Sequence, residues 1–281
     1  MTKTDRFGLF LAGFLVLFVI FFCAGAPIFT RYPADGATAT TTSGMLEARH
    51  LPPSLEHPFG TDELGRDVFA RSLYGGRISL AIGVLSRLLA VAIGGLLGLF
   101  AGFFKGKFDI VLSRVIEVVL AFPSLILAIA IGVALGPGLK TVVIAIVAVS
   151  WVDVAVLTRA IAAQVSEQDF VLGARALGES TTGILFRHVL PNCLPVLLVA
   201  FSFGIASAVM VEASLSFLGL GISSGGDLPS WGWMIYTAQY HLAAAPWAVF
   251  GPGLLLSVTV LGWNLLGDVL RDILDVRRVG S

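Results

Sequence analysis

The stretch ISLAIGVLSRLLAVAIGGLLGLFAGFF, residues 78–104, decides the fold class of this chain. It contains one charged residue, Arg87, and is longer than the roughly 20 apolar residues that cross the hydrocarbon core of a bilayer as a helix. Of the 281 residues in the whole chain, 57% are hydrophobic and 13% are charged, and the mean hydropathy is +0.92. Soluble domains carry about a quarter charged residues. The composition therefore excludes a soluble globule and predicts a membrane protein.

Six apolar runs are long enough to span a bilayer. They lie between segments that hold nearly all of the charge, at Phe7–Phe29, Ile78–Phe104, Ile110–Leu135, Thr141–Ala163, Cys193–Ile222 and Pro246–Leu270. None of them alternates apolar and polar residues as the strands of a membrane barrel do. We therefore predict an all-α membrane protein with six transmembrane helices. The first run exceeds the roughly 7 to 15 apolar residues of a signal peptide, so it is interpreted as a retained helix.

The distribution of positive charge predicts the orientation of these helices, because short cytoplasmic loops retain Lys and Arg. With the N-terminus in the cytoplasm, most of these residues fall on the cytoplasmic side: Lys3, Arg6, Lys105, Lys107, Arg114, Arg159, Arg175, Arg187, Arg271, Arg277 and Arg278. Six spans then place both termini in the cytoplasm. Residues 1–77 would form an N-terminal helix with an extracytoplasmic loop. Residues 78–281 would form a five-helix core that contains the cytoplasmic segment 164–192.

Several classes of function are disfavoured by the absence of their motifs. Lys+Arg and Asp+Glu both number 18, so no excess positive charge points to a nucleic-acid partner. The sequence contains no G-x-x-x-x-G-K-[ST] loop for binding phosphates. Cys23 and Cys193 have no C-x-x-C spacing, and the four histidines lack the spacing of a metal site. We expect a chain that is not an enzyme and holds no cofactor or metal of its own.

The cytoplasmic segment QVSEQDFVLGARALGESTTGILFRHVLPN, residues 164–192, is predicted to form two short helices. The first runs from about Asp169 to Leu177. It ends at Gly178, which can adopt the left-handed conformation that closes a helix. Ser180 is placed to cap the next turn. The exposed face would combine small residues with Arg175, whose guanidinium forms charge-assisted hydrogen bonds, and this combination suits a docking surface for another protein.

Two motifs in this segment resemble the EAA loop of bacterial ABC-importer permeases: ARALG at 174–178 and FRHVLPN at 186–192. Three further stretches resemble the dipeptide, oligopeptide and nickel permease family. They are HPFGTDELGRDVFARSLYGGRISL at 57–80, EASLSFLGLG at 212–221 and GDVLRDILDVR at 267–277. Together the matches extend from residue 57 to residue 277. The chain is most similar to the second-permease type of this family, the DppC- or OppC-like subunits.

The resemblance implies a type I ABC-importer permease fold in the bacterial cytoplasmic (inner) membrane, with a coupling helix that contacts an ATPase. The implied partners are a homologous second permease, two cytoplasmic ABC ATPases that would bind ATP and Mg, and an extracytoplasmic substrate-binding protein. The implied coupling residues are Leu172, Gly173, Ala174, Arg175, Ala176, Leu177, Gly178, Glu179 and Ser180. The family loop usually begins with Glu-Ala-Ala, whereas this chain has Leu172-Gly173-Ala174. Glu167 and Asp169 are candidates to replace the missing carboxylate.

The implied cargo is a di- or oligopeptide, with nickel or a metal chelate as the alternative. Two other classes are weighed against an importer. An intramembrane hydrolase would need a matched Ser and His pair, and a transporter driven by an ion gradient would use Asp153 and Glu212 as coupling sites. The sequence offers no such Ser and His pair at similar depth, and we favour the importer.

Charged side chains within the spans are costly in hydrocarbon, so they face a protein interior or an aqueous path. Arg87, Asp153 and Glu212 are candidate pathway residues. For Arg87, an ion pair with an acidic residue fits as well as substrate contact. For Asp153 and Glu212, a structural role fits equally well. Glu117 lies near the cytoplasmic end of its span, where snorkelling or pairing is favoured.

Two further patterns predict packing. Gly94, Gly98, Gly102 and Gly106 recur every four residues and form a small-residue face for close helix contact, which would also permit sliding between transport states. The second outer segment, Ser223–Ala245, contains aromatic residues that suit a belt at the membrane interface: Trp231, Trp233, Tyr236 and Tyr240.

Overall fold

The computed structural model describes residues 3–221 and 229–274, and only the backbone of residues 3–6. Within these ranges every regular element is helical, as predicted. The only β-like contacts there are two isolated bridges, Ala37 with Arg66 and Thr61 with Asp67. The helices are α1 Lys3–Ala24, α2 Ala26–Phe29, α3 Thr42–Glu47, α4 Val68–Phe104, α5 Gly106–Leu120, α6 Ser124–Leu135, α7 Leu139–Val165, α8 Asp169–Ala176, α9 Thr181–Gly183, the π-helix η1 Ile184–Val189, α10 Leu190–Phe217, α11 Trp231–Ala238, the 3-10 helix η2 Gln239–His241 and α12 Trp247–Leu274.

Five helical segments are long and apolar enough to cross a membrane, namely α1, α4, α7, the segment Thr181–Phe217 that ends with α10, and α12. A sixth span arises if α5 and α6 are counted together, although the two helices meet at an angle of 86°. The third predicted run is therefore two helices. Pro123 supplies no backbone N–H and disfavours the helical conformation of Phe122, so α5 ends at Leu120.

The helix α4 begins well before the predicted start of its span at Ile78. It contains 37 residues, which at 1.5 Å per residue is about 55 Å, far more than the ~30 Å of a bilayer core. Arg71 and Arg77 lie in its first turns. These charges end the apolar run but not the helix. An apolar run shows which residues can lie in the hydrocarbon core, whereas the helix can continue beyond it. The boundary expected after residue 77 falls inside α4.

The start of α4 is set by Asp67, whose Oδ1 accepts a hydrogen bond from the N–H of Ala70 at 2.7 Å. Its Oδ2 lies 2.8 Å from Nδ1 of the buried His57. Burial raises the pKa of Asp67, and the hydrogen bonds from Ala70 and His57 oppose this rise. Because the folded pKa exceeds the unfolded one, the titration of Asp67 favours folding at acid pH, and this contribution is lost as the pH rises through the folded pKa.

Replacing Asp67 should separate its capping role from the cost of its buried charge. Asp67→Asn keeps a good N-cap residue without the charge, so we expect an unfolding temperature at or above that of the wild type at pH 7. Asp67→Ala removes the cap and should cost about 1 kcal/mol. Thermal unfolding of the detergent-solubilised protein measures both changes. Equal destabilisation by the two variants would contradict this account.

The most extensive helix contact joins α4 to α7, and glycines make it possible. A Cβ on Gly94, Gly98 or Gly102 would collide with a backbone carbonyl oxygen of α7. The predicted packing face is confirmed for these three positions. It does not include Gly106, because α4 ends at Phe104 and Gly106 begins α5 with φ of +70° and open space around it.

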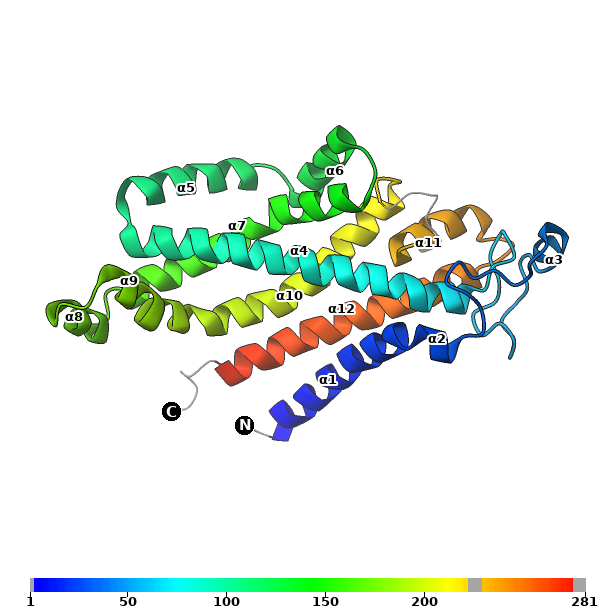
Figure 1. Ribbon diagram of the computed structural model, residues 1–281, viewed down its shortest axis with the longest axis horizontal. Helices are drawn as coiled ribbons and strands as arrows, with labels where there is room; N and C mark the ends of the chain where they lie inside the picture. Colours follow the sequence, from blue (N-terminus) through cyan, green and yellow to red (C-terminus); the bar gives the residue numbers. More distant parts are fainter. Residues whose placement is uncertain (1–2, 222–228, 275–281) are drawn as a thin grey trace.

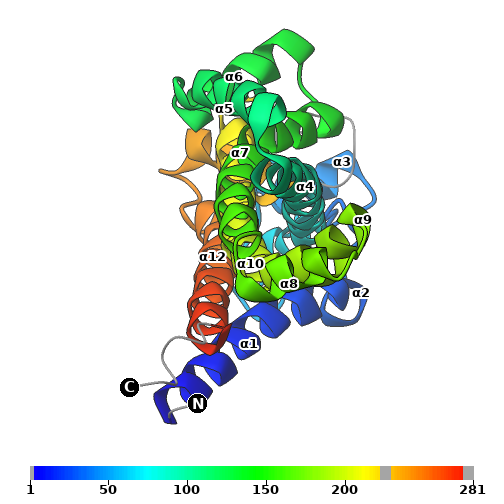
Figure 2. The same ribbon diagram turned by 90° about the vertical axis from the view of Figure 1, so that its left-hand side faces the viewer.

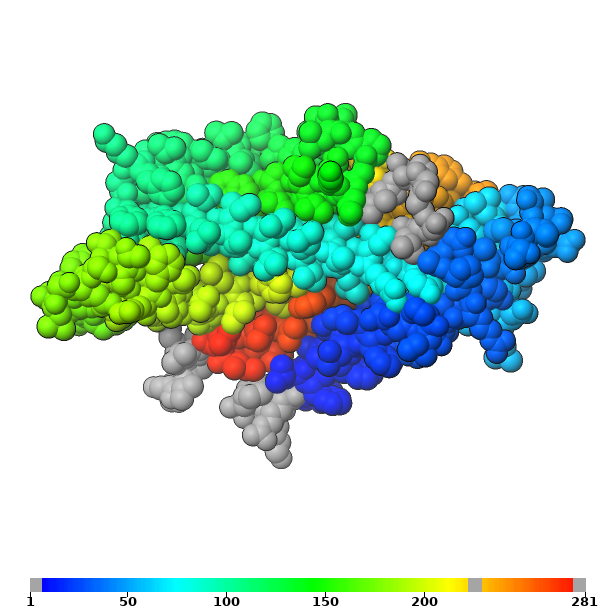
Figure 3. Space-filling model, in the orientation of Figure 1, coloured from blue at the N-terminus to red at the C-terminus, as the bar shows by residue number. Residues whose placement is uncertain are grey.

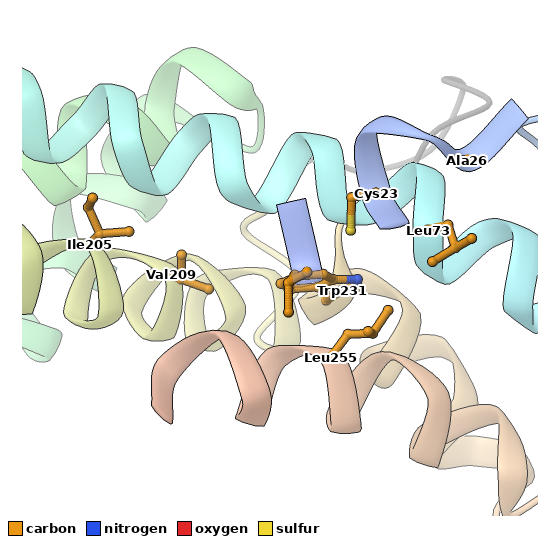
Figure 4. Packing of buried hydrophobic residues seen from close by; sticks show 8 residues of the cluster. Cys23, Ala26, Leu73, Ile205, Val209, Trp231 and Leu255 are labelled. Atoms are coloured by element: carbon orange, nitrogen blue, oxygen red, sulfur yellow. The ribbon is translucent and has the colours of Figure 1, made fainter. Parts of the chain in front are cut away.

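The part of the core beside α11 is built around Trp231, which is fully buried (Figure 4). Its ring packs in a cluster with Cys23, Leu73 and Leu255, and its Nε1 donates a hydrogen bond to the carbonyl of Ser72 at 2.8 Å. The prediction that Trp231 belongs to an interfacial belt is therefore wrong. The reason is that α11 packs against α10, α12 and α4, where a backbone carbonyl accepts from the indole N–H.

The ends of the molecule carry different elements (Figure 1). The start of α1, the end of α12 and the α8–α9 segment lie toward one end, whereas α2, α3 and α11 lie toward the other (Figure 1). The α8–α9 segment projects beyond the other helices in the space-filling view (Figure 3). Ile222 and Ser223, at the expected boundary of the second outer segment, and Arg277 and Arg278 lie outside the described residues.

Candidate functional site

The predicted coupling helix ends at a glycine in the expected conformation. Gly178 has φ of +80°. Its N–H donates to the carbonyl of Arg175 at 3.1 Å, and the N–H of Glu179 donates to the carbonyl of Ala174 at 3.1 Å. These two bonds define a Schellman motif. Ser180 then caps α9, since its Oγ accepts from the N–H of Gly183 at 3.1 Å.

The surface of α8 faces solvent at the projecting end of the molecule, nearest the viewer in Figure 2. Leu177 is 90% exposed and Leu172 is 47% exposed, and the other exposed members of the predicted set are Gly173, Arg175, Ala176, Gly178 and Ser180. Arg175 forms no ion pair with any side chain in the described part of the chain. The exposed face therefore combines apolar contact area with one cation that is available to another protein.

The remaining members of the predicted set are engaged within the loop. Ala174 is half-buried and packs against the cluster under α8. Glu179 Oε2 lies 2.7 Å from Nε2 of His188, and Glu179 Oε1 lies 3.9 Å from Nη1 of Arg187. The carboxylate of Glu179 is therefore held by the second half of the same loop.

The two carboxylates considered as replacements for the missing glutamate differ in their surroundings. Glu167 accepts a hydrogen bond from Nζ of Lys105 at 2.6 Å, and this bond lowers the pKa of Glu167. The Glu167–Lys105 hydrogen bond therefore connects the start of the loop to the junction of α4 and α5. Asp169 lies exposed in the first turn of α8, where negative charge is favourable to the helix dipole.

A buried cluster anchors α8 to the spans. Val171 is the one fully enclosed residue of α8. It packs with side chains from the ends of α4, α7 and α10 and from η1: Leu99, Phe103, Ala162, Ile184, Leu185, Val189 and Cys193. Because close-packed interiors transmit displacement, a movement of α8 would be passed into all three spans.

A cavity of about 870 Å³ lies between α4, α7, α10, α12 and the α5–α6 pair. It reaches from Arg87, in the middle of α4, to Leu274 at the end of α12, and its walls are mostly apolar. Of the candidate pathway residues, Arg87 and Asp153 line this cavity and Glu212 does not. Glu117 lies elsewhere, exposed and paired with Arg114 at 2.6 Å.

Arg87 and Asp153 form an ion pair, so the pairing alternative holds for Arg87 within the same chain. Nη2 of Arg87 lies 3.0 Å from Oδ2 of Asp153. Backbone carbonyls hold the guanidinium as well: Ala200 accepts from Nε and Nη2 at 3.1 and 2.8 Å, and Ser150 accepts from Nη1 at 3.1 Å. The two side chains differ sharply in exposure, 3% for Arg87 and 56% for Asp153.

Glu212 is 0% exposed and belongs to a separate polar cluster. Its carboxylate accepts hydrogen bonds from Oγ of Ser79 at 3.1 Å and from Oγ of Ser216 at 2.7 Å. Ser79 in turn accepts from the N–H of Trp231 at 3.1 Å. Glu212 therefore connects α4, α10 and the start of α11, away from the cavity.

Sequence reasoning missed the groups that hold Arg87. The carbonyls of Ala200 and Ser150 have no sequence signal, because every residue carries one. Gly204 was also missed, although a Cβ there would collide with the Arg87 side chain. A glycine in an apolar helix does signal close approach. The partner that approaches it cannot be read from the local sequence.

Comparisons with known proteins give consistent results. The sequence model of a family described as "Binding-protein-dependent transport system inner membrane component" matches residues 94–280. The oligopeptide transport system permease protein OppC of Bacillus subtilis (strain 168) is 38% identical over 97% of this chain and 85% of its own length. The dipeptide transport system permease protein DppC of Alkalihalophilus pseudofirmus is 38% identical over 95% of this chain and 84% of its own. A probable peptide ABC transporter permease protein of Sinorhizobium fredii, y4tQ, is 42% identical over 80% and 76%.

Proposed function

This chain belongs to the family of binding-protein-dependent transport system inner membrane components, and from that premise we propose that it is the permease subunit of an ATP-driven importer of di- and oligopeptides. The observation that carries the substrate class is the similarity over nearly the whole chain to permeases named for oligopeptide and dipeptide transport. The cavity of about 870 Å³ is within the ~300–1,000 Å³ range of small-molecule sites.

The chain works with other subunits in this proposal. Two cytoplasmic ATPases bind ATP and Mg and dock on the exposed face of α8, where Leu172, Arg175 and Leu177 offer apolar and cationic contacts. A second permease completes the path, and an extracytoplasmic binding protein delivers the peptide. Closure of the ATPases displaces α8, and the cluster around Val171 carries the displacement into α4, α7 and α10.

Both termini and the α8–α9 segment are cytoplasmic in this proposal. The support is that the start of α1, the end of α12 and α8 lie toward one end of the molecule (Figure 1), the end at which most Lys and Arg are expected. The cavity reaches the last residue of α12. In the proposed orientation the cavity extends toward the cytoplasmic side, where an importer releases its cargo.

Uptake measurements test the proposal. Cells with and without this chain are given a labelled dipeptide, and separately labelled nickel with and without a histidine-like chelator. We expect the cells that lack the chain to lose dipeptide uptake only. Loss of nickel uptake alone would move the assignment to metal import. Unchanged uptake of both would contradict a role in the import of these solutes.

A pair of variants at one position tests the coupling role of the α8 turn. Gly178 needs its left-handed backbone, and no atom lies within 4 Å of a Cβ placed there. Asn tolerates this conformation, whereas β-branched Val does not, at a cost of about 1–2 kcal/mol or more. We expect Gly178→Val to lose dipeptide uptake while the chain still reaches the membrane, and Gly178→Asn to retain most of it. Equal uptake by the two variants would contradict a role for this turn.

A further inference from the structure

The guanidinium of Arg87 has no donor left for a substrate. It carries five N–H groups, and the structure provides five hydrogen bonds. Two go to the carbonyl of Ala200, one goes to the carbonyl of Ser150, and two go to Asp153, at 3.0 and 3.4 Å. Its position is also enforced sterically, because Gly204 leaves room for the side chain where any Cβ would collide with it. Arg87 is therefore a fixed part of the cavity wall.

Asp153 is the exposed partner in this pair. Its side chain is 56% exposed and lines the cavity. A carboxylate has about four lone-pair sites, and Arg87 uses one on each oxygen, so acceptor sites remain on the cavity side. Glu212 offers no comparable group, because it is fully buried beneath serine hydroxyls. In a mostly apolar cavity, an ionised carboxylate can only accept hydrogen bonds, and it selects N–H donors and cations.

We propose that Asp153 contacts the cargo in the cavity, where its carboxylate accepts hydrogen bonds from the protonated amino terminus of a peptide, and that Arg87 is the positioning residue that orients this carboxylate. The inference rests on the proposed function and extends it to one chemical group of the substrate. Arg271 lines the same cavity from the last turn of α12 and supplies a cation for the opposite end of a peptide.

A thiol beside the carboxylate allows a direct test. Ser150 lines the cavity one turn before Asp153, and the described bonds to Arg87 use only its carbonyl, so S150C adds a thiol without removing them. The native Cys23 and Cys193 are buried. The complex of this chain with its partner permease and ATPases is purified without the binding protein. The rate at which a water-soluble maleimide modifies S150C is then measured with no peptide, with a millimolar dipeptide, and with its N-acetyl derivative.

The free dipeptide should slow the modification of S150C about tenfold more than the acetylated one, because acetylation removes the ammonium group. In S150C/D153N the two peptides should protect equally. S150C/R87K keeps the charge but has three donors instead of five, so the preference for the free dipeptide should fall between these two results. An unchanged preference in S150C/R87K would overturn the positioning role of Arg87.

Three results would overturn the role of Asp153: equal protection of S150C by both peptides, protection by neither, or a preference that persists in S150C/D153N. The uptake assay distinguishes a wrong role for Asp153 from a wrong proposed function. If dipeptide uptake in cells depends on the chain while S150C is protected by neither peptide, only the role of Asp153 fails. If uptake does not depend on the chain, the proposed function fails.

Discussion

Gly204→Ala is expected to abolish dipeptide uptake and to lower the amount of chain in the membrane, because the added methyl group occupies the space of the Arg87 side chain. The guanidinium would have to leave the carbonyls of Ala200 and Ser150 and the carboxylate of Asp153. A buried neutral donor that loses its acceptor costs about 1–3 kcal/mol, and the buried guanidinium, which is charged, costs more. The Arg87 side chain is only 3% exposed, so water in the cavity reaches little of the guanidinium to replace the lost acceptors.

The control is Gly253→Ala in α12, where no atom lies within 4 Å of the new Cβ. It makes the same chemical change in another span, and we expect nearly normal uptake. Immunoblotting of membranes reports the amount of chain, and uptake is expressed per amount of chain. If Gly204→Ala transported as well as Gly253→Ala, Arg87 would be free to move and its fixed place in the cavity wall would be refuted.

Gly98→Ala is expected to be strongly destabilising, because Gly98 lies on the face between α4 and α7. The Cβ would collide with the carbonyl oxygen of Ala155 and lie 2.9 Å from the N–H nitrogen of Arg159. Both are backbone atoms of α7, which cannot turn away as a side chain can, so the helices must separate. Overpacking of this kind costs about 1–3 kcal/mol, and we expect the upper part of that range because the contacts are with backbone.

Gly95→Ala is the matched control for this prediction, because it lies on the same helix three residues away. Its Cβ would meet only the methyl groups of Leu197 at 3.5 and 3.6 Å, which is ordinary contact. We expect Gly95→Ala to be neutral or slightly stabilising, since alanine favours helix more than glycine. Thermal unfolding of the solubilised protein compares the two variants. Equal midpoints would show that the glycine face is not needed for close packing.

Sequence reasoning succeeded mainly where the physical cause is local, although it missed the break at Pro123 between α5 and α6. Apolar runs locate the spans because transfer into hydrocarbon depends on each segment's own composition. The end of α8 at Gly178 and the cap at Ser180 were predicted because the capping bonds join residues only a few positions apart. The spacing of Gly94, Gly98 and Gly102 predicted a packing face, although the sequence did not say that α7 would cover it.

The sequence by itself determined that this chain is an all-helical membrane protein, where five of its spans lie, how the segment 164–192 turns and which family it resembles. The tertiary structure alone decided how the charged residues divide between cavity and interior. Arg87 meets the carbonyl of Ala200 from 113 residues away, and Ser79 meets Glu212 across 133 residues. Similar apolar runs surround Asp153 and Glu212, yet helix rotation and packing expose one carboxylate to the cavity and enclose the other. Such pairings depend on which helices become neighbours, and hydropathy carries no information about that choice.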